Sequence, residues 1–288
     1  MTVQRSLVEP AAQVGVAPLP HTPGLWRPFN PPIRSWHGQR VWIVGASSGI
    51  GRAAAEQLVA QGATVLASAR GEAALQALVT QHTRTGVPPT VQAWPMDVTD
   101  TRAVALTARA LLAEGPLDLV LFCAGHYRAL RADAFDLAEM QRHMAINYSG
   151  ALNLLDALLP TLIGRGHGHI SLVSSVAGFR GLPKGLAYGP TKAALTHLAE
   201  TLYLDLAPRG IGVSVVHPGF VKTPLTAQND FEMPALITPE VAAADMLAGI
   251  AAGDFEIHFP RRFTRWMKLL RMLPYRAYFP LVRRATGL

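Results

Sequence analysis

The chain has 288 residues, of which 50% are hydrophobic and 16% charged, a composition that excludes an intrinsically disordered protein. The net charge of +7 would suit a nucleic-acid partner, but eight bases and no acid lie between Ile257 and Leu288, so the rest of the chain is almost neutral. We therefore attribute the basicity to the C-terminal tail and expect no nucleic-acid partner, since the sequence contains no recognised binding module.

The cysteine content and the hydropathy indicate the compartment. Cys123 is the only cysteine, which excludes an internal disulfide and suits a reducing environment. The sequence contains no apolar run of about eighteen residues, and Met1–Pro10 lacks the apolar stretch of a signal sequence. We expect a cytoplasmic protein.

The first 38 residues form a segment of their own. They hold seven prolines, each of which fixes φ and removes a backbone donor. We expect residues 1–38 to be an extended, weakly structured arm, followed by a domain over 39–260 and a tail over 261–288.

Short apolar runs alternate with longer helical patterns between residues 39 and 260. The runs that predict strands are Val41–Gly45, Thr64–Ala69, Val91–Trp94, Leu117–Cys123, His169–Ser174, Gly212–His217 and Phe255–Phe259. Helices are predicted near 50–61, 71–83, 101–113, 136–163, 188–207 and 239–252. This alternation predicts a single α/β domain: a doubly wound, mostly parallel sheet of about seven strands with helices on both faces.

The turn after the first predicted strand is rich in glycine and leads directly into a helix. It runs from Gly45 to Gly51, with Gly49 between them. Such a turn lets backbone N–H groups approach a pyrophosphate, and the helix N-terminus adds positive potential. Its position predicts a Rossmann-type dinucleotide site, with an ordinary tight turn as the alternative.

The end of the second predicted strand indicates which dinucleotide binds. An acid there would bind the adenosine ribose hydroxyls and repel a 2′-phosphate, but the chain has Arg70. An arginine pairs well with phosphate, which favours NADP(H) over NAD(H); the alternative is a solvated arginine. Asp97, after the third strand, could accept the adenine amino hydrogen or cap the helix that follows.

A tyrosine and a lysine stand four residues apart at the start of a predicted helix. This spacing places Tyr188 and Lys192 on one helix face, and Pro190 is tolerated in a first turn. A free tyrosine has a pKa of about 10, and a nearby ammonium group, together with a nicotinamide ring, would lower it towards neutral pH. We therefore expect Tyr188 to act as a proton donor or acceptor.

Two further polar positions complete the predicted site. Ser175, at the end of the fifth strand, can hold a substrate oxygen, with the adjacent Ser174 as the competing candidate. Asn147 lies within a predicted helix, either as a core residue or as the holder of a water molecule that links Lys192 to solvent.

Over residues 40 to 259 these motifs resemble those of the short-chain dehydrogenase/reductase family, in its single-domain branch. Gly45, Gly49 and Gly51 match the three glycines of that branch's cofactor loop. The positions that match the family's catalytic four are Asn147, Ser175, Tyr188 and Lys192. Those that resemble the segment closing over the nicotinamide carboxamide are Pro218, Gly219, Val221 and Thr223.

The resemblance implies an oxidoreductase that transfers a hydride between NADP(H) and a ketone, aldehyde or alcohol. Ser175 would orient the carbonyl, Tyr188 would protonate it, and Lys192 would bind the nicotinamide ribose. Asn147 would complete a water-mediated proton path. The implied cofactor contacts are Gly45, Ser47, Ser48, Gly49, Ile50, Gly51, Arg70, Asp97, Val98, Ala124, Gly125, Tyr188, Lys192, Pro218, Gly219, Val221 and Thr223. A homodimer or homotetramer through the two long helices is also implied.

The sequence departs from the family pattern at two places. Val44 stands where the family usually has threonine, and Phe122 and Cys123 stand where it has two asparagines before Ala124-Gly125. The missing amides weaken the hydrogen bonding expected around the cofactor. We expect Cys123 to be a small buried residue rather than a nucleophile.

The tail has apolar residues at helical spacing with bases mainly on the other side. The apolar positions are Phe263, Trp266, Met267, Leu270 and Leu273, followed beyond Pro274 by Tyr275, Tyr278, Phe279, Leu281 and Val282. The interleaved bases include Arg262, Arg265, Lys268 and Arg271. Two hypotheses stay open: peripheral contact with an anionic membrane surface, or packing of the apolar face on the domain or on a second subunit.

The segment between Thr223 and Pro239 is expected to wall the substrate pocket. It is short and fairly apolar, with Met233, Leu236 and Ile237, which favours a hydrophobic carbonyl or alcohol substrate. The alternative function is a cofactor-binding scaffold, docked to a membrane or partner through its tail, with little catalysis.

Overall fold

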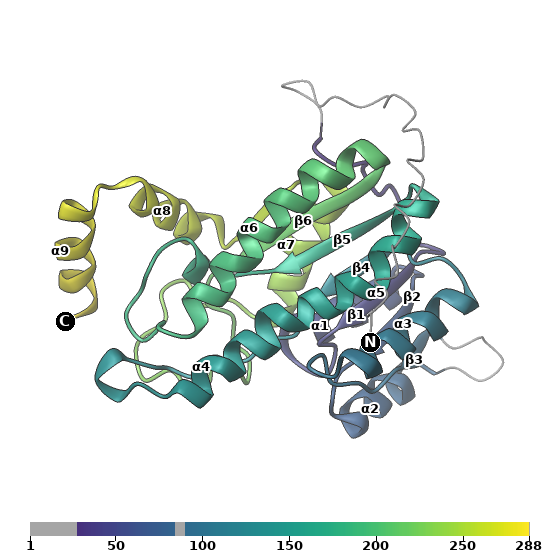
Figure 1. The fold of residues 1–288 in the computed structure, drawn as a ribbon, viewed down its shortest axis with the longest axis horizontal. Helices are drawn as coiled ribbons and strands as arrows, with labels where there is room; N and C mark the ends of the chain where they lie inside the picture. The colour runs from purple at the N-terminus through teal and green to yellow at the C-terminus, as the bar shows by residue number, and fades with distance from the viewer. Residues whose placement is uncertain (1–27, 84–89, 288) are drawn as a thin grey trace, which may run out of the picture.

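The computed structural model describes residues 28–83 and 90–287 (Figure 1). At its centre is a seven-stranded sheet in the order β3-β2-β1-β4-β5-β6-β7, in which every neighbouring pair is parallel. The strands are β1 (Arg40–Val44), β2 (Thr64–Ser68), β3 (Val91–Ala93), β4 (Leu119–Phe122), β5 (Gly168–Val173), β6 (Ile211–Pro218) and β7 (Glu256–Phe259). The predicted doubly wound α/β fold is confirmed.

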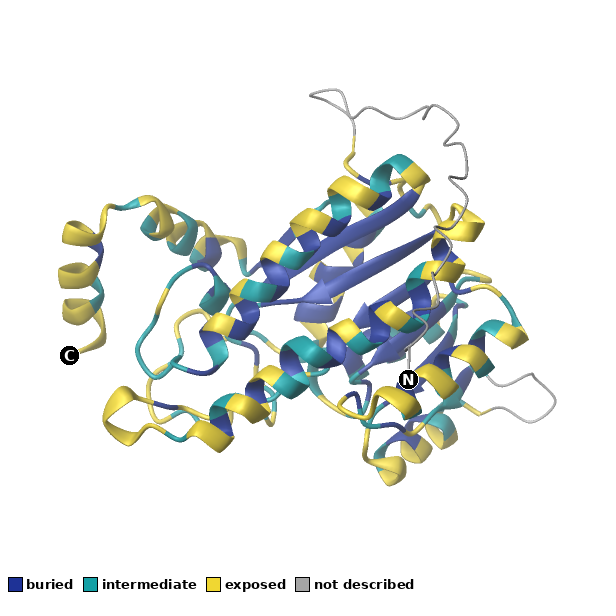
Figure 2. Ribbon diagram, in the orientation of Figure 1, coloured by how far each residue is buried: buried dark blue, intermediate teal, exposed yellow. Residues whose placement is uncertain are grey.

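Helices cover both faces of the sheet, as the apolar character of the strands requires. On one face pack α1 (Gly49–Ala60), α2 (Glu72–His82) and α7 (Pro239–Ala252). On the other pack α3 (Thr101–Glu114), α5 (Gly150–Arg165) and α6 (Tyr188–Leu206). Figure 2 shows the strands buried between these two layers. The chain leaves β1 towards β2 on one side and later returns to β4 on the other, so a crevice opens at the carboxyl ends of β1 and β4.

The single helix predicted near 136–163 has three parts. They are α4 (Leu137–Met144), one π-helical turn (Ala145–Ser149), and α5. A π-turn inserts an extra residue without interrupting the helix, so apolar periodicity does not reveal it. This π-turn directs the Asn147 side chain towards the loop after β4, where it forms hydrogen bonds with the backbone of His126.

Part of the predicted N-terminal arm packs against the domain. Asn30 is buried, and its side chain exchanges two hydrogen bonds of 2.9 Å with the backbone of Val213 in β6. Trp36 belongs to the hydrophobic core, and the Ile33 N–H donates to the carbonyl of Ala251. Packing therefore continues upstream of the boundary expected at residue 38, while residues 1–27 of the arm lie outside the described residues.

Two helices follow the sheet at the C-terminal end. They are α8 (Arg261–Met272) and α9 (Tyr275–Thr286), which lie beside the loops that follow β5 and β6 (Figure 1). Among the described residues, every helix is too short or too polar to cross a bilayer.

Candidate active site

A cavity of about 560 Å³ lies at the carboxyl ends of the central strands. Its lining contains the predicted residues Gly45, Ser47, Ser48, Gly49, Ile50, Gly51, Arg70, Asp97, Val98, Ala124, Gly125, Ser175, Tyr188, Lys192, Pro218, Gly219, Val221 and Thr223. These positions come from seven separate stretches of sequence, and the fold brings them together around one cavity. Asn147 lies behind this lining, fully buried.

The glycine turn is pressed against the end of β4. Gly45 has φ +100°, and a Cβ there would lie 2.6 Å from the backbone nitrogen of Ala124. A Cβ on Gly51 would overlap the carbonyl oxygen of Gly45. Ser48 at the N-terminus of α1 makes no side-chain cap, and the first turn of α1 holds no acid. The turn therefore presents a helix N-terminus to the cavity, which fits a pyrophosphate.

The far end of the cavity carries Arg70 and Asp97. Burial opposes ionisation of Asp97, but hydrogen bonds from Thr99 and the charge of Arg70 outweigh it and lower the Asp97 pKa. The cap of α3 is Asp100, which accepts from the N–H of Ala103 at 3.0 Å. Of the two roles considered for Asp97, helix capping is thus wrong.

Tyr188 and Lys192 lie in the first turns of α6, as their spacing predicts. Lys192 is buried, its Nζ donates to the carbonyl of Val173 at 2.8 Å, and it lies 5.4 Å from the centroid of the Tyr188 ring. Burial lowers the pKa of Lys192 to about 8. The ammonium group is therefore held beside the phenol in a poorly solvated place.

The electrostatics of Tyr188 differ from the expectation. Burial raises the pKa of Tyr188 above its usual value and the nearby Tyr127 raises it further, while the Ser175 hydroxyl acts in the opposite direction. The lowering expected from Lys192 is therefore not produced by the protein's own groups. At neutral pH the phenol keeps its proton, which is the state a proton donor needs.

The two adjacent serines have different surroundings. The Ser174 hydroxyl is buried, donates to the Lys192 carbonyl at 2.7 Å and lies 3.0 Å from the Thr196 hydroxyl. The half-buried Ser175 hydroxyl accepts from the N–H of Ala177 at 3.1 Å and faces Tyr188. The geometry thus separates Ser174, which ties β5 to α6, from Ser175, which faces the cavity.

The side chain of Asn147 holds the loop after β4. Its Oδ1 accepts from the N–H of His126 at 2.7 Å, and its Nδ2 donates to the His126 carbonyl and to the Thr191 hydroxyl, each at 3.0 Å. A Cβ on Gly125 would lie 3.8 Å from Lys192 Nζ and 3.9 Å from Asn147 Oδ1. Asn147 and Lys192 therefore border the same glycine, from two sides.

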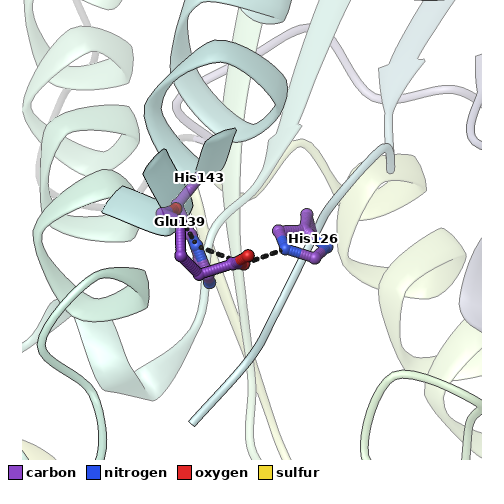
Figure 3. Close-up of side chains that lie close together, drawn as sticks. All are labelled: His126, Glu139 and His143. Atoms are coloured by element: carbon purple, nitrogen blue, oxygen red, sulfur yellow. Dashed lines mark hydrogen bonds and ion pairs between the residues drawn. The ribbon is translucent and has the colours of Figure 1, made fainter. Parts of the chain in front are cut away.

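Three ionisable side chains cluster beside this loop (Figure 3): His126, Glu139 and His143. The Nε2 atom of His143 accepts from the N–H of Arg128 at 3.1 Å, so Nδ1 carries the proton and donates to the Glu139 carbonyl at 2.8 Å. The Glu139 carboxylate pairs with His126 and lies 3.6 Å from the Arg128 guanidinium. Both ring nitrogens of His143, the Nε2 atom of His126 and the Glu139 carboxylate are bonded to protein groups, so the cluster braces this loop.

Sequence reasoning missed Tyr127. Its ring meets that of Tyr188 edge-on, with centroids 5.1 Å apart, and its carbonyl accepts from Gln228 Nε2 at 2.6 Å. The available signal was its position two residues after Gly125, at the carboxyl end of a central strand. Tyr127 therefore packs against the Tyr188 ring beside the cavity.

The segment between Thr223 and Pro239 contributes to the cavity wall, as expected, but only through its first residues. The cavity lining after Thr223 consists of Pro224, Leu225 and Thr226. Ile237 instead pairs with Val221 through a β-bridge. The expectation that Met233, Leu236 and Ile237 also line the cavity is wrong.

The departures from the family pattern are absorbed by packing. Val44 and Phe122 are fully buried in the core. Burial raises the pKa of the Cys123 thiol to about 12, so the reactive thiolate is not formed at neutral pH. This agrees with Cys123 as a small packing residue.

Comparison with known proteins identifies the family. The family described as short chain dehydrogenase matches residues 39–233. An uncharacterized oxidoreductase of Myxococcus xanthus is 39% identical over 243 residues, which cover 84% of this chain and 95% of that protein. The 2-keto-3-deoxy-L-fuconate dehydrogenase of Xanthomonas campestris is 34% identical over 192 residues, covering 66% of this chain and 61% of that protein.

Solved structures agree with this assignment. A short-chain dehydrogenase from Burkholderia cenocepacia in complex with NADP has a TM-score of 0.74 and 25% identity, covering 86% of this chain and 98% of that chain. One from Sphingobium yanoikuyae in complex with NADPH has a TM-score of 0.72 and 26% identity, covering 80% and 92%. The chain therefore belongs to the short-chain dehydrogenase family, whose members are NAD(P)-dependent oxidoreductases of alcohol and carbonyl groups.

Proposed function

We propose that this protein is an NADP(H)-dependent reductase that interconverts a hydrophobic ketone or aldehyde and its alcohol. The observation that carries the proposal is the content of one cavity. The glycine turn and Arg70 lie at one end of it, and Ser175, Tyr188 and Lys192 lie at the other.

In this proposal the bound dinucleotide supplies the hydride and the chain's own residues handle the carbonyl oxygen. The Ser175 hydroxyl donates a hydrogen bond to that oxygen and holds it beside Tyr188. Tyr188 then donates its proton as negative charge develops on the oxygen. Lys192 binds the nicotinamide ribose hydroxyls and, through its charge, stabilises the phenolate that remains.

The proton lost by Tyr188 has to be replaced. Asn147 and Lys192 meet beside Gly125, and Asn147 Oδ1 keeps one acceptor lone pair beyond its bond to His126. We assign to Asn147 the role of holding a water molecule that passes a proton to Lys192. The same side chain also fixes the loop that carries Tyr127.

The preference for NADP(H) rests on the exposed Arg70 at the adenosine end. Its guanidinium can pair with a 2′-phosphate, and the chain has no acid at the end of β2 to repel one. The two similar structures that hold NADP and NADPH are in agreement. Asp97 and Val98 then contact the adenine.

The substrate class and the assembly follow from apolar surface. Tyr127 and Leu225 flank the site near Tyr188 and Gly125, which favours a hydrophobic substrate.

The helices α5 and α6 expose Leu152, Ile163 and Leu204, which suits a homodimer or homotetramer formed through these helices. We propose that this assembly works in the cytoplasm.

Titration of the purified protein with NADPH and NADH, followed by nicotinamide fluorescence, tests the proposal. We expect NADPH to bind at least about tenfold more tightly than NADH, and Arg70→Ala to remove most of that difference. Arg102→Ala, an exposed arginine of α3, serves as the matched control and leaves both affinities unchanged. Equal affinities in the unaltered protein would contradict the NADP(H) preference, and binding without turnover of any carbonyl would favour the scaffold alternative.

A further inference from the structure

The C-terminal tail, residues 261–287, is attached to the domain by specific contacts. The inner face of α8 holds the buried Thr264, whose hydroxyl lies 2.7 Å from His258 Nδ1. Lys268 Nζ donates to Glu256 at 2.6 Å, and the ring of Phe263 packs on Phe220 with centroids 5.6 Å apart. The helix α8 is therefore docked on β7 and on the segment that follows β6.

One arginine from the loop before Tyr188 holds the junction of the two tail helices. The Arg180 guanidinium donates to the carbonyls of Leu270 and Leu273, at the C-terminal end of α8. It also lies over the rings of Tyr275 and Tyr278, at 4.4 and 4.2 Å from their centroids. The Tyr278 hydroxyl donates to the carbonyl of Gly181 at 2.8 Å. The helix α9 is thus fixed to a loop of the active site.

This packing uses most of the apolar stripe seen in the sequence. Phe263, Met267, Leu270 and Leu273 are half-buried, as the hypothesis of packing on the domain predicts. A second apolar row stays outside: Trp266, Leu269 and Met272 are 69%, 54% and 80% exposed. Their spacing of three residues places them on one face of α8. On α9, Tyr275 and Phe279 are also exposed, and most of the α9 ribbon is coloured as exposed (Figure 2).

The exposed charges of the tail itself all have one sign, although Arg261 and Arg265 also border a pocket lined by Asp245 and Asp254 of the domain. The exposed bases of the tail are Arg261, Arg262, Arg265, Arg271, Arg276, Arg283 and Arg284. No acid occurs from residue 257 onward. A two-fold contact with a second copy would bring these arginines against one another, so charge disfavours that occupant. An anionic lipid surface offers negative head groups for the arginines and an acyl boundary for the apolar row.

We propose that the outer face of α8 and α9 binds an anionic lipid surface as a peripheral, interfacial contact. Trp266, Leu269 and Met272 enter the head-group boundary, and Arg262 and Arg265 on the same helix pair with lipid phosphates. The tail is anchored by Arg180 and Phe263 to the loops on either side of Tyr188, so the bound membrane lies beside the substrate side of the cavity. A hydrophobic substrate can then enter from the lipid.

Co-sedimentation of the full-length chain with vesicles tests this proposal. We expect binding to vesicles of phosphatidylcholine with one quarter phosphatidylglycerol, and at least about tenfold weaker binding to pure phosphatidylcholine vesicles or at high salt. The variants Trp266→Ser/Leu269→Ser and Arg262→Gln/Arg265→Gln should each weaken binding by at least about tenfold. The matched controls on α3, the exposed Leu106→Ser and the pair Arg102→Gln/Arg109→Gln, should bind as the unaltered chain does.

Three outcomes would overturn the proposal. They are equal binding to neutral and anionic vesicles, no binding to either, and tail variants that bind as tightly as the unaltered chain. A fall in oligomeric mass of Trp266→Ser/Leu269→Ser, measured by light scattering without lipid, would instead assign the face to a second copy. The assay requires no turnover, and Tyr188→Phe should bind vesicles as the unaltered chain does. Vesicle binding and the proposed enzymatic function are therefore tested independently.

Discussion

The side chain of Asn147 forms hydrogen bonds with both the N–H and the carbonyl of His126, as the backbone of a neighbouring strand would. The same amide donates to the Thr191 hydroxyl, which in turn donates to the carbonyl of Tyr188 at 2.8 Å. One buried side chain thus connects the loop after β4 to the helix turn that presents Tyr188. The π-helical turn is the local distortion that aims Asn147 at this loop.

The first prediction concerns this connection. Asn147→Ala leaves the His126 groups without their partner, and we expect a loss of about 1–3 kcal/mol in the free energy of unfolding together with a lower kcat. Asn153→Ala is the control, because Asn153 also donates from α5 to a loop carbonyl, that of Val98 at 2.8 Å. It should cost stability and weaken cofactor binding at most, because Val98 lies in the cavity, while kcat at saturating NADPH stays unchanged. Equal kcat values in the two variants would argue against a role for Asn147 in positioning the site.

The second prediction concerns the glycine turn. Gly51→Ala places a methyl group on the carbonyl oxygen of Gly45, so the turn has to move away from the dinucleotide. We expect at least about tenfold weaker NADPH binding and a loss of about 1–3 kcal/mol of stability. Gly164→Ala, in α5 with open space around its Cβ position, should be neutral or slightly stabilising. Fluorescence titration and urea unfolding measure both, and unaltered NADPH affinity in Gly51→Ala would refute the close approach.

The third prediction is that the buried Lys192 ammonium group lowers the free energy of unfolding of the protein. Its pKa falls from 10.5 to about 8 on folding, so below pH 8 the folded state holds an ammonium group that burial disfavours. This penalty shrinks as the pH rises from 8 to 10.5, because the unfolded chain then binds more protons than the folded one. Lys192→Met should therefore gain about 2 kcal/mol at pH 7 and less at pH 10, after the lost bond to Val173 is counted.

Urea unfolding at both pH values checks this third prediction, with the exposed Lys222→Met as control. The control should change the free energy of unfolding by less than about 0.5 kcal/mol at either pH. A destabilised Lys192→Met at pH 7 would show that the buried ammonium group is fully compensated.

The fourth prediction concerns the loss of stability at acidic pH. His169 is buried beside Ser214, with Nε2 at 3.0 Å from the hydroxyl, and burial lowers its pKa from 6.5 to about 4. The unfolded chain takes up the proton first, so this histidine removes stability as the pH falls from 6.5 to 4, by up to about 3 kcal/mol. His169→Gln should flatten that slope. Ser214→Ala removes the same hydrogen bond but keeps the histidine, so its slope should stay steep.

The sheet and the pairing of Tyr188 with Lys192 follow from local patterns. Apolar runs bounded by turns lie within one or two residues of all seven strands, because strands buried on both faces must be apolar throughout. The sequence predicts that Tyr188 and Lys192 lie close together because residues four apart lie on the same face of a helix. The glycine turn was found because close backbone contact excludes every other residue.

The remaining features depend on contacts between distant segments. The π-turn brings Asn147 into hydrogen-bonding contact with His126, twenty-one residues upstream. Asn30 is buried because it meets the backbone of Val213, which no local pattern predicts. In the tail, the sequence defined an apolar stripe, but its division between an inner and an outer face depends on where α8 docks on the domain.

The most direct test of the central claim is NADPH-dependent reduction of a panel of hydrophobic ketones and aldehydes, by the unaltered protein and by Tyr188→Phe. The matched control is Tyr203→Phe, whose hydroxyl donates to the carbonyl of Phe29, away from the cavity. We predict turnover by the unaltered protein and the control, and a loss of roughly 10²- to 10⁴-fold in Tyr188→Phe with NADPH affinity unchanged. Equal turnover by Tyr188→Phe, or turnover of small polar alcohols alone, would contradict the account.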